Sequence, residues 1–282
     1  MLLDAPVVAN VPVAQDYLRI TLAAADVAAA THPGQFLMMT IARADEPAPV
    51  LPRPMAIYGV NAAAGTVDVV YRTVSSGTQR MATWGAGERM TIVGPLGRGF
   101  TIPSRARSIL LLGRGIGNCS LTTLVPEAVS RGVRVTVVVS ARNPEALVGG
   151  DTCREQGAAA VHEVVDSDGT SDPAAVLQRL GAEAAGYDGY YVCGSRRLLE
   201  MAARLAGEGR RGGSAGRAEV QVSLEAHMAC GLGYCHGCAA GRPGLPAETP
   251  LVCRDGPVFR CAPGEGERDG DGDGEPRGGG AR

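Results

Sequence analysis

The sequence predicts three folded parts: a small antiparallel β-barrel, an α/β domain with a parallel sheet, and a small cysteine-rich domain at the C-terminal end. Short β-branched and aromatic runs separated by turns fill the first part of the chain. A continuous apolar run with a glycine turn and a helical stretch begins after Pro103. Five of the eight cysteines then lie between Ala218 and Cys261. The expected boundaries are 1–102, 103–213 and 214–262, followed by a tail over 263–282.

The barrel is predicted from strands at residues 17–22, 36–41, 55–60 and 66–72, with a short helix over 78–84 between two strands. The tail, rich in glycine and charge, cannot bury apolar area and is expected to be disordered.

The α/β domain is predicted from one repeated strand, turn and helix pattern. Apolar strands are expected at 108–112, 133–140 and 190–194, and helices at 120–131 and 197–206. The first strand runs into the glycine turn Gly113, Gly115 and Gly117, the context in which a dinucleotide binds. The turn is not a G-x-G-x-x-G, so a purely structural role is the alternative.

Composition excludes several classes of function. The 282 residues carry 27 basic and 29 acidic side chains, a net charge of −2, which gives no reason to expect nucleic acid or a membrane as partner. The chain contains no lysine, which excludes a Schiff-base lysine and a Walker-A loop. No apolar stretch is long enough to span a membrane, and Met1-Leu2-Leu3-Asp4 lacks the cations of a signal peptide. We expect a cytoplasmic protein whose cysteines serve metal or redox chemistry.

The cysteine spacing is the most specific signal. Cys230-x4-Cys235-x2-Cys238, with Cys253 after 14 further residues, is the plant-type ferredoxin spacing for a [2Fe–2S] cluster. Glycines between the ligands allow backbone N–H groups to turn toward the sulfurs. A four-cysteine zinc site and unliganded thiols are the alternatives.

Two further features favour a bound diphosphate. Arg53-Pro54 opens a strand with a guanidinium that can grip a diphosphate bidentately. Gly77-Thr78 begins the short helix, whose N-terminus offers unpaired N–H groups. Each alone is equally compatible with an ordinary turn or helix cap.

Together these motifs resemble the electron-transfer subunit of class 1B dihydroorotate dehydrogenase, a ferredoxin-reductase-like flavoprotein. The resemblance covers about residues 8–262. It rests on P-G-Q-F from Pro33, G-P-L-G-x-G-F from Gly94, S-L-E-x-x-M-x-C-G-x-G-x-C-x-x-C from Ser223 and C-x-D-G-P-V-F from Cys253. Such a subunit passes electrons from NAD(P)H through FAD and the cluster to an FMN-containing catalytic subunit, in a 2+2 heterotetramer.

The resemblance implies the roles of individual residues, none of them catalytic. The FAD contacts would be Arg53, Pro54, Met55, Ala56, Val70, Tyr71, Arg72, Gly77 and Thr78. The nicotinamide nucleotide would meet Gly113, Gly115, Gly117, Cys193 and Gly194. The cluster ligands would be Cys230, Cys235, Cys238 and Cys253.

The chain departs from the family pattern near the nicotinamide site. Ala56 replaces a serine, Arg114 a glycine and Ser195 a proline, while Cys119-Ser120 stands where Ala-Pro or Pro-Pro is usual. Arg114 is expected either to obstruct a diphosphate or to grip a phosphate such as that of NADPH, so we expect weak or altered nicotinamide use. A reductase serving another oxidoreductase or an oxygenase, and a zinc-holding interaction module, are the alternative functions.

Overall fold

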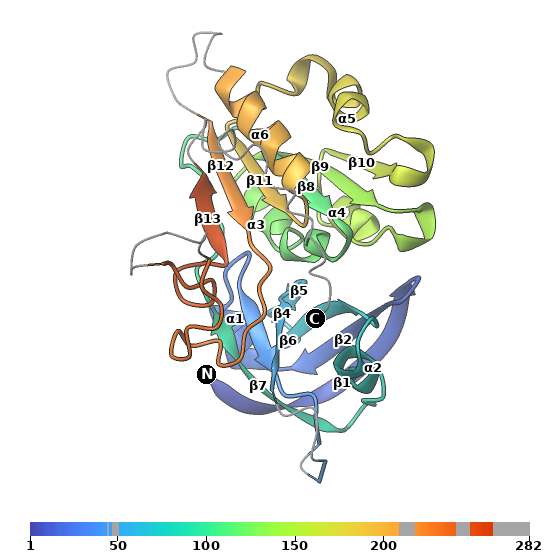
Figure 1. The fold of residues 1–282 in the computed structure, drawn as a ribbon, viewed down its shortest axis with the longest axis vertical. Helices are drawn as coiled ribbons and strands as arrows, with labels where there is room; N and C mark the ends of the chain where they lie inside the picture. Colours follow the sequence, from blue (N-terminus) through green and yellow to red (C-terminus); the bar gives the residue numbers. More distant parts are fainter. Residues whose placement is uncertain (44, 47–50, 209–217, 241–248, 262–282) are drawn as a thin grey trace, which may run out of the picture.

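The computed structural model describes residues 1–43, 45–46, 51–208, 218–240 and 249–261. The predicted tail lies outside them. Two sheets and their helices make up the molecule, one above the other in Figure 1. Among the described residues, no helix has the length and apolar character needed to cross a membrane.

The N-terminal part is a seven-stranded antiparallel sheet in the order β4-β3-β7-β1-β2-β6-β5. Its strands are β1 (Leu2–Ala14), β2 (Tyr17–Ala23), β3 (Phe36–Met39), β4 (Arg53–Ala56), β5 (Gly59–Asn61), β6 (Thr66–Arg72) and β7 (Arg89–Leu96). Helix α1 (Ala25–Ala30) follows β2, and α2 (Ser76–Met81) follows β6. Since β4 and β5 end the order, closure into a barrel stays a prediction.

The sequence patterns did not indicate β1, which is the longest strand. The single strand predicted over 55–60 is wrong, because the structure has two separate strands there, β4 and β5. The backbone leaves the β4 pairing after Ala56 and pairs again only from Gly59. Ile57 and Tyr58 between these strands are instead buried, and their backbone N–H groups donate to Gln35 and Asp68 carbonyls. A continuous apolar pattern cannot reveal this change of partner.

The second part is a six-stranded sheet in the order β10-β9-β8-β11-β12-β13. Its strands are β8 (Ser108–Arg114), β9 (Arg134–Ala141), β10 (Ala160–Val165), β11 (Gly189–Cys193), β12 (Glu219–Ser223) and β13 (Val258–Cys261). All neighbours are parallel except β12 and β13. Strands β12 and β13 flank the cysteine segment in sequence, so this segment is anchored in the α/β sheet at both ends.

Helices cover both faces of this sheet. One face packs on α5 (Pro173–Leu180) and α6 (Arg196–Glu208), the other on α3 (Leu124–Ser130) and α4 (Gly150–Glu155). The helix expected over 120–131 is shorter than predicted, because the glycine turn leads first into a 3₁₀ segment, Gly115–Ser120. The strand-turn-helix order places the glycine turn at the carboxyl end of β8, facing the antiparallel sheet.

Candidate functional site

The four predicted cluster ligands lie on one segment, which descends from the α/β sheet onto the antiparallel sheet (Figure 1, orange to red). Cys238 and Cys253 are buried, whereas Cys230 is half-buried and Cys235 is exposed. Backbone N–H groups point at the sulfurs, as the glycine spacing predicts. The Leu232 and Cys235 amides donate to the Cys230 Sγ at 3.4 Å each, and the Gly233 amide donates to the Cys253 Sγ at 3.1 Å.

These thiols are grouped in two pairs. The Sγ atoms of Cys238 and Cys253 are 3.2 Å apart, and Cys230 interacts with Cys235. Within the described ranges no three His, Cys, Asp or Glu side chains gather as around a single metal ion. The amide donors, from Cys235 first, lower the pKa of the Cys230 thiol to about 6. Sulfurs in two pairs, with amides turned toward them, suit a group with two metal centres.

Arg53 and Gly77 meet at the start of α2. A Cβ on Gly77 would lie 3.0 Å from the Nε and Nη2 atoms of Arg53, so only glycine leaves this guanidinium its position. The Thr78 hydroxyl and amide are occupied in a capping box with Ser75. The guanidinium donates to the Leu51 carbonyl at 2.7 Å and keeps further N–H donors for an anion.

Alternation along β6 divides the predicted FAD contacts between two faces. The Tyr71 ring is buried in the core of the antiparallel sheet, where its hydroxyl donates to Asn10. Val70 faces the α/β part together with Tyr17, and Arg72 stacks over the Tyr17 ring. Only the backbone of Tyr71 is therefore available to a cofactor on that face.

The glycine turn lies where the strand order reverses, between β8 and β11, a position at which open α/β sheets bind ligands. Close packing inside the chain explains Gly113 and Gly117 of this turn, and Gly194 after β11. A Cβ on Gly117 would lie 2.8 Å from the Cys193 backbone, and one on Gly194 would lie 2.4 Å from the Arg114 carbonyl oxygen. A Cβ on Gly113 would lie 2.0 Å from the Asn118 amide oxygen. These glycines bring the two strand ends together.

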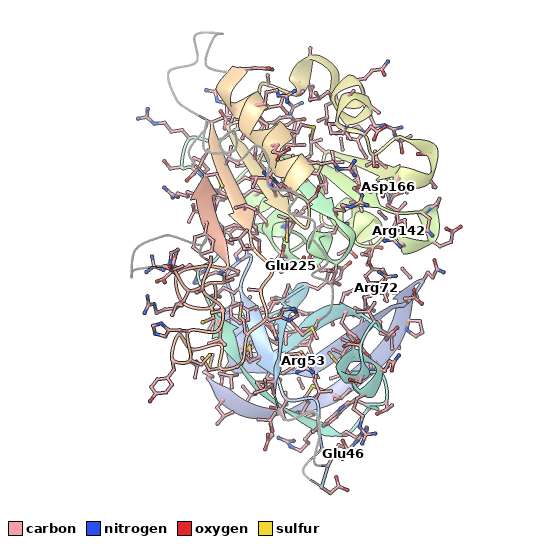
Figure 2. The ribbon with its side chains drawn as sticks, in the orientation of Figure 1. Glu46, Arg53, Arg72, Arg142, Asp166 and Glu225 are labelled. Atoms are coloured by element: carbon pink, nitrogen blue, oxygen red, sulfur yellow. The ribbon has the colours of Figure 1, made fainter. Side chains whose placement is uncertain are left out.

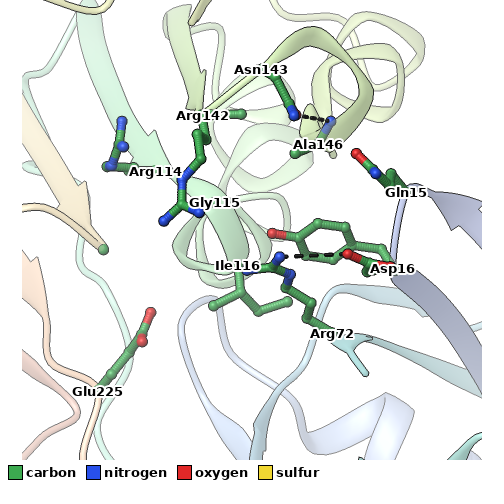
Figure 3. Close-up of a pocket in the computed structure, with 13 residues that line it drawn as sticks. Gln15, Asp16, Arg72, Arg114, Gly115, Ile116, Arg142, Asn143, Ala146 and Glu225 are labelled. Atoms are coloured by element: carbon green, nitrogen blue, oxygen red, sulfur yellow. Dashed lines mark hydrogen bonds and ion pairs between the residues drawn. The ribbon is translucent and has the colours of Figure 1, made fainter. Parts of the chain in front are cut away.

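A cavity of about 350 Å³ lies between the two sheets beside this turn. It is lined by both parts of the chain, including Asp16 and Arg72 below and Arg142 above. Arg72 forms an ion pair with Asp16 at 3.5 Å. Figures 2 and 3 show the Arg142 and Arg72 side chains approaching the cavity from opposite walls. Among the described residues, no ion pair engages the Arg142 guanidinium, so this wall presents an uncompensated positive charge.

Arg114 lines this cavity, but Asp166 holds its guanidinium. Its guanidinium binds both carboxylate oxygens of Asp166 and donates to the Ser140 hydroxyl at 3.1 Å. Figure 3 shows it turned away from Arg142 and Arg72. Arg114 first, and then Ser171, lower the pKa of Asp166 to about 2. The charge of Arg114 is therefore compensated within the α/β part, a partnership across 52 positions that sequence reasoning missed.

Glu225 is the second feature that sequence reasoning left without a role. It follows β12, lines the cavity and lies 3.9 Å from the Cys193 thiol. Protein atoms surround its carboxyl on the side away from the cavity, and this desolvation raises its pKa. Burial likewise raises the pKa of Cys193 to about 12, so the thiol stays neutral.

Comparison with known proteins decides what the cysteine segment is. Residues 225–262 match the iron-sulfur cluster binding domain of dihydroorotate dehydrogenase B. The chain is 30% identical over 260 residues to the electron transfer subunit of dihydroorotate dehydrogenase B (NAD(+)) from Fusobacterium nucleatum, covering 91% of this chain and 95% of the relative. It is 32% identical over 261 residues to that subunit from Geobacillus thermodenitrificans, covering 90% of this chain and 95% of the relative.

The chain belongs to this family of electron transfer subunits. The family match favours the iron-sulfur cluster over zinc at the four cysteines. Among solved structures, the NADH-dependent reduced ferredoxin-NADP oxidoreductase has a similar fold, with a TM-score of 0.70 at 21% identity over 91% of this chain and 87% of that one. The ferredoxin reductase of carbazole 1,9a-dioxygenase has a TM-score of 0.59 at 21% identity, over 74% of this chain and 66% of that one. The ferredoxin-reductase-like fold predicted from the sequence is confirmed.

Proposed function

We propose that this chain is the electron transfer subunit of a dihydroorotate dehydrogenase B, working in the cytoplasm in pyrimidine biosynthesis. Its cofactors are FAD and a [2Fe–2S] cluster. The observation that carries the proposal is the two-pair cysteine site with its inward amides, within a segment that matches the family's cluster domain. FAD supplies the conversion between a two-electron donor and a one-electron carrier.

The chain's own residues would hold these groups as follows. Cys230, Cys235, Cys238 and Cys253 would ligate the cluster. The Arg53 guanidinium and the unoccupied amides at the start of α2 would bind the FAD diphosphate. Pro54, Met55, Ala56, Val70, Tyr71, Arg72 and Thr78 would line the rest of the flavin site.

A nicotinamide nucleotide would occupy the cavity between the sheets. Of its predicted contacts, Gly115 and Gly194 line this cavity at the reversal of strand order, whereas Gly113, Gly117 and Cys193 are not among the lining residues. Arg142 and Arg72 supply positive charge for its phosphates. Because Asp166 holds Arg114, the arginine that replaces the family glycine need not block the diphosphate.

The partner would be an FMN-containing catalytic subunit in a 2+2 heterotetramer, docked over the cluster. Leu232 is 60% exposed and Tyr234 is 90% exposed, both beside the half-buried and exposed ligands Cys230 and Cys235. Apolar side chains exposed around a redox centre suit a docking face. The Arg254–Asp255 ion pair lies beside them, against Gly233.

Two measurements test the proposal. Iron, sulfide and flavin analysis of protein purified without oxygen should return two irons, two sulfides and one FAD per chain, as a [2Fe–2S] cluster requires. Zinc in place of iron would refute the cluster.

Size-exclusion chromatography with the candidate catalytic subunit should then give a complex that Leu232→Glu and Tyr234→Glu weaken. Val74→Glu is the matched control, because Val74 is 65% exposed but lies in the loop between β6 and α2. If the Leu232 and Tyr234 variants bind the partner as well as the Val74 variant does, the cluster loop (residues 228–238) is not the docking face.

A further inference from the structure

Strand β3 packs into two different cores with its two faces. Leu37 and Met39 point into the core of the antiparallel sheet. Phe36 and Met38 point the other way, into a core shared with the cluster segment. That second core contains Met228, Cys238, Leu251, Val252 and Cys253. Strand β3 therefore lies between the core of the antiparallel sheet and the core that contains the predicted cluster ligands Cys238 and Cys253.

Met38 packs against the cluster loop. A Cβ on Gly231 would lie 2.3 Å from the Met38 Cγ and 2.9 Å from its Sδ, so the thioether rests against the loop backbone directly after Cys230. Met38 is only 1% exposed. Gly231 also has a φ of +69°, a conformation that favours glycine. The loop and the methionine are thus fitted to one another.

The same side chain lies on the face of the flavin motif. In the antiparallel pairing of β3 with β4, Met38 is opposite Pro54 and Phe36 is opposite Ala56. Residues directly opposite in such a pair project to the same side of the sheet. Met38 therefore shares one face with Pro54 and Ala56, two of the predicted FAD contacts, while it touches the cluster loop.

We propose that Met38 is the positioning residue that couples the flavin site to the cluster. This inference rests on the proposed function. The thioether packs beneath the loop, holds it at a set distance from β4 and keeps water from the inner face of the cluster. One electron leaves the reduced flavin and one enters the oxidised cluster. The extra negative charge on the cluster is disfavoured where water is excluded, so Met38 keeps the cluster's reduction potential low.

The test compares two neighbouring methionines. Met38→Ala and Met38→Leu change the face of β3 that packs against the cluster segment, and Met39→Leu is the matched control. Met39 has the same residue type and is also fully buried, but it faces the opposite core. The readouts are iron and flavin content, the electron paramagnetic resonance spectrum of the dithionite-reduced protein, the midpoint potential of the cluster and the half-life of its absorbance in air.

We expect Met38→Ala to keep both cofactors, alter the resonance spectrum, raise the midpoint potential and shorten the half-life in air several-fold. Met38→Leu should change each readout less, and Met39→Leu should change none of the cluster signals. Equal cluster signals in Met38→Ala and Met39→Leu would overturn the role of Met38.

If Met38→Ala does not fold, Gly231→Ala tests the same contact, since its Cβ displaces the Met38 side chain. A Gly231→Ala protein with an unchanged spectrum and potential would also overturn the inference. Absence of iron from the unsubstituted chain would instead overturn the proposed function.

Discussion

The carboxylate of Asp166 binds the guanidinium of Arg114 at the carboxyl ends of the α/β strands, beside the cavity. The pair joins the end of β8 to the turn that follows β10. An arginine at a glycine turn would otherwise leave an uncompensated charge where a nucleotide diphosphate is expected. The ion pair makes Arg114 part of the scaffold.

We expect Asp166→Asn to lower the free energy of unfolding by about 1 kcal/mol or less, because the pair is partly exposed. Arg114 lowers the Asp166 pKa to about 2, against ~3.9 in the unfolded chain. The stabilisation is therefore complete above about pH 5 and is lost as the pH falls from 4 toward 2. Urea unfolding at pH 6 and 9 should give the same difference between the two proteins. A difference that grows or vanishes between these values would contradict the assignment. Glu183→Gln, which removes a more exposed pair with Arg134, is the control.

Arg142→Ala should weaken nicotinamide nucleotide binding. Loss of one charge-assisted hydrogen bond to a phosphate corresponds to about 1.5–3 kcal/mol, a rise of roughly tenfold or more in KM. Arg114→Gly should change KM much less, since Asp166 already binds its guanidinium. Steady-state reduction of the flavin by NADH and by NADPH measures both effects. A larger effect of Arg114→Gly would show that this side chain leaves Asp166 to bind the nucleotide.

Cys235→Ser should remove or severely destabilise the cluster while the flavin stays bound. Cys235 is exposed on the loop, whereas the antiparallel sheet has its own core, to which the loop contributes nothing. Iron content and the visible spectrum of the anaerobically purified variant measure the two cofactors separately. Cys153→Ser, at a buried thiol on α4, is the control and should retain both. Loss of flavin together with iron in Cys235→Ser would show that the two sites depend on one another.

Glu225→Gln should stabilise the chain at neutral and alkaline pH. Desolvation raises the carboxyl pKa in the folded state, so the folded chain binds its proton more tightly than the unfolded chain. The stability of the unsubstituted chain therefore falls as the pH rises through this pKa, and the glutamine variant avoids that loss. The gain should be below about 1 kcal/mol, because the side chain reaches solvent in the cavity. Thermal melts at pH 5 and 8 measure it, and a variant that is less stable at pH 8 would mean that the carboxylate has a stabilising partner.

Local patterns in the sequence predicted the candidate cluster ligands, the glycine turn and about half of the strands: β2, β3, β6, β8, β9 and β11. In each case the signal lies within a few residues of the chain. The loop that turns the Leu232 and Cys235 amides toward Cys230 needs only its own glycines and cysteines. The β-branched and aromatic run over 66–72 likewise predicts β6 without knowledge of its neighbours.

Only the tertiary structure decided which partners those local elements meet. Strands β4 and β5 are separate because they pair with different strands, β3 and β6. The pairing of β12 with β11 and the contact of Asp166 with Arg114 likewise depend on residues far apart in the chain. The run from Phe36 to Met39 reads as a uniformly apolar strand, and nothing in it shows that Met38 packs on the cluster loop while Met39 packs on another core. Apolar patterning shows that both faces of a strand are buried, but the material that buries each face is set by the packing of the whole chain.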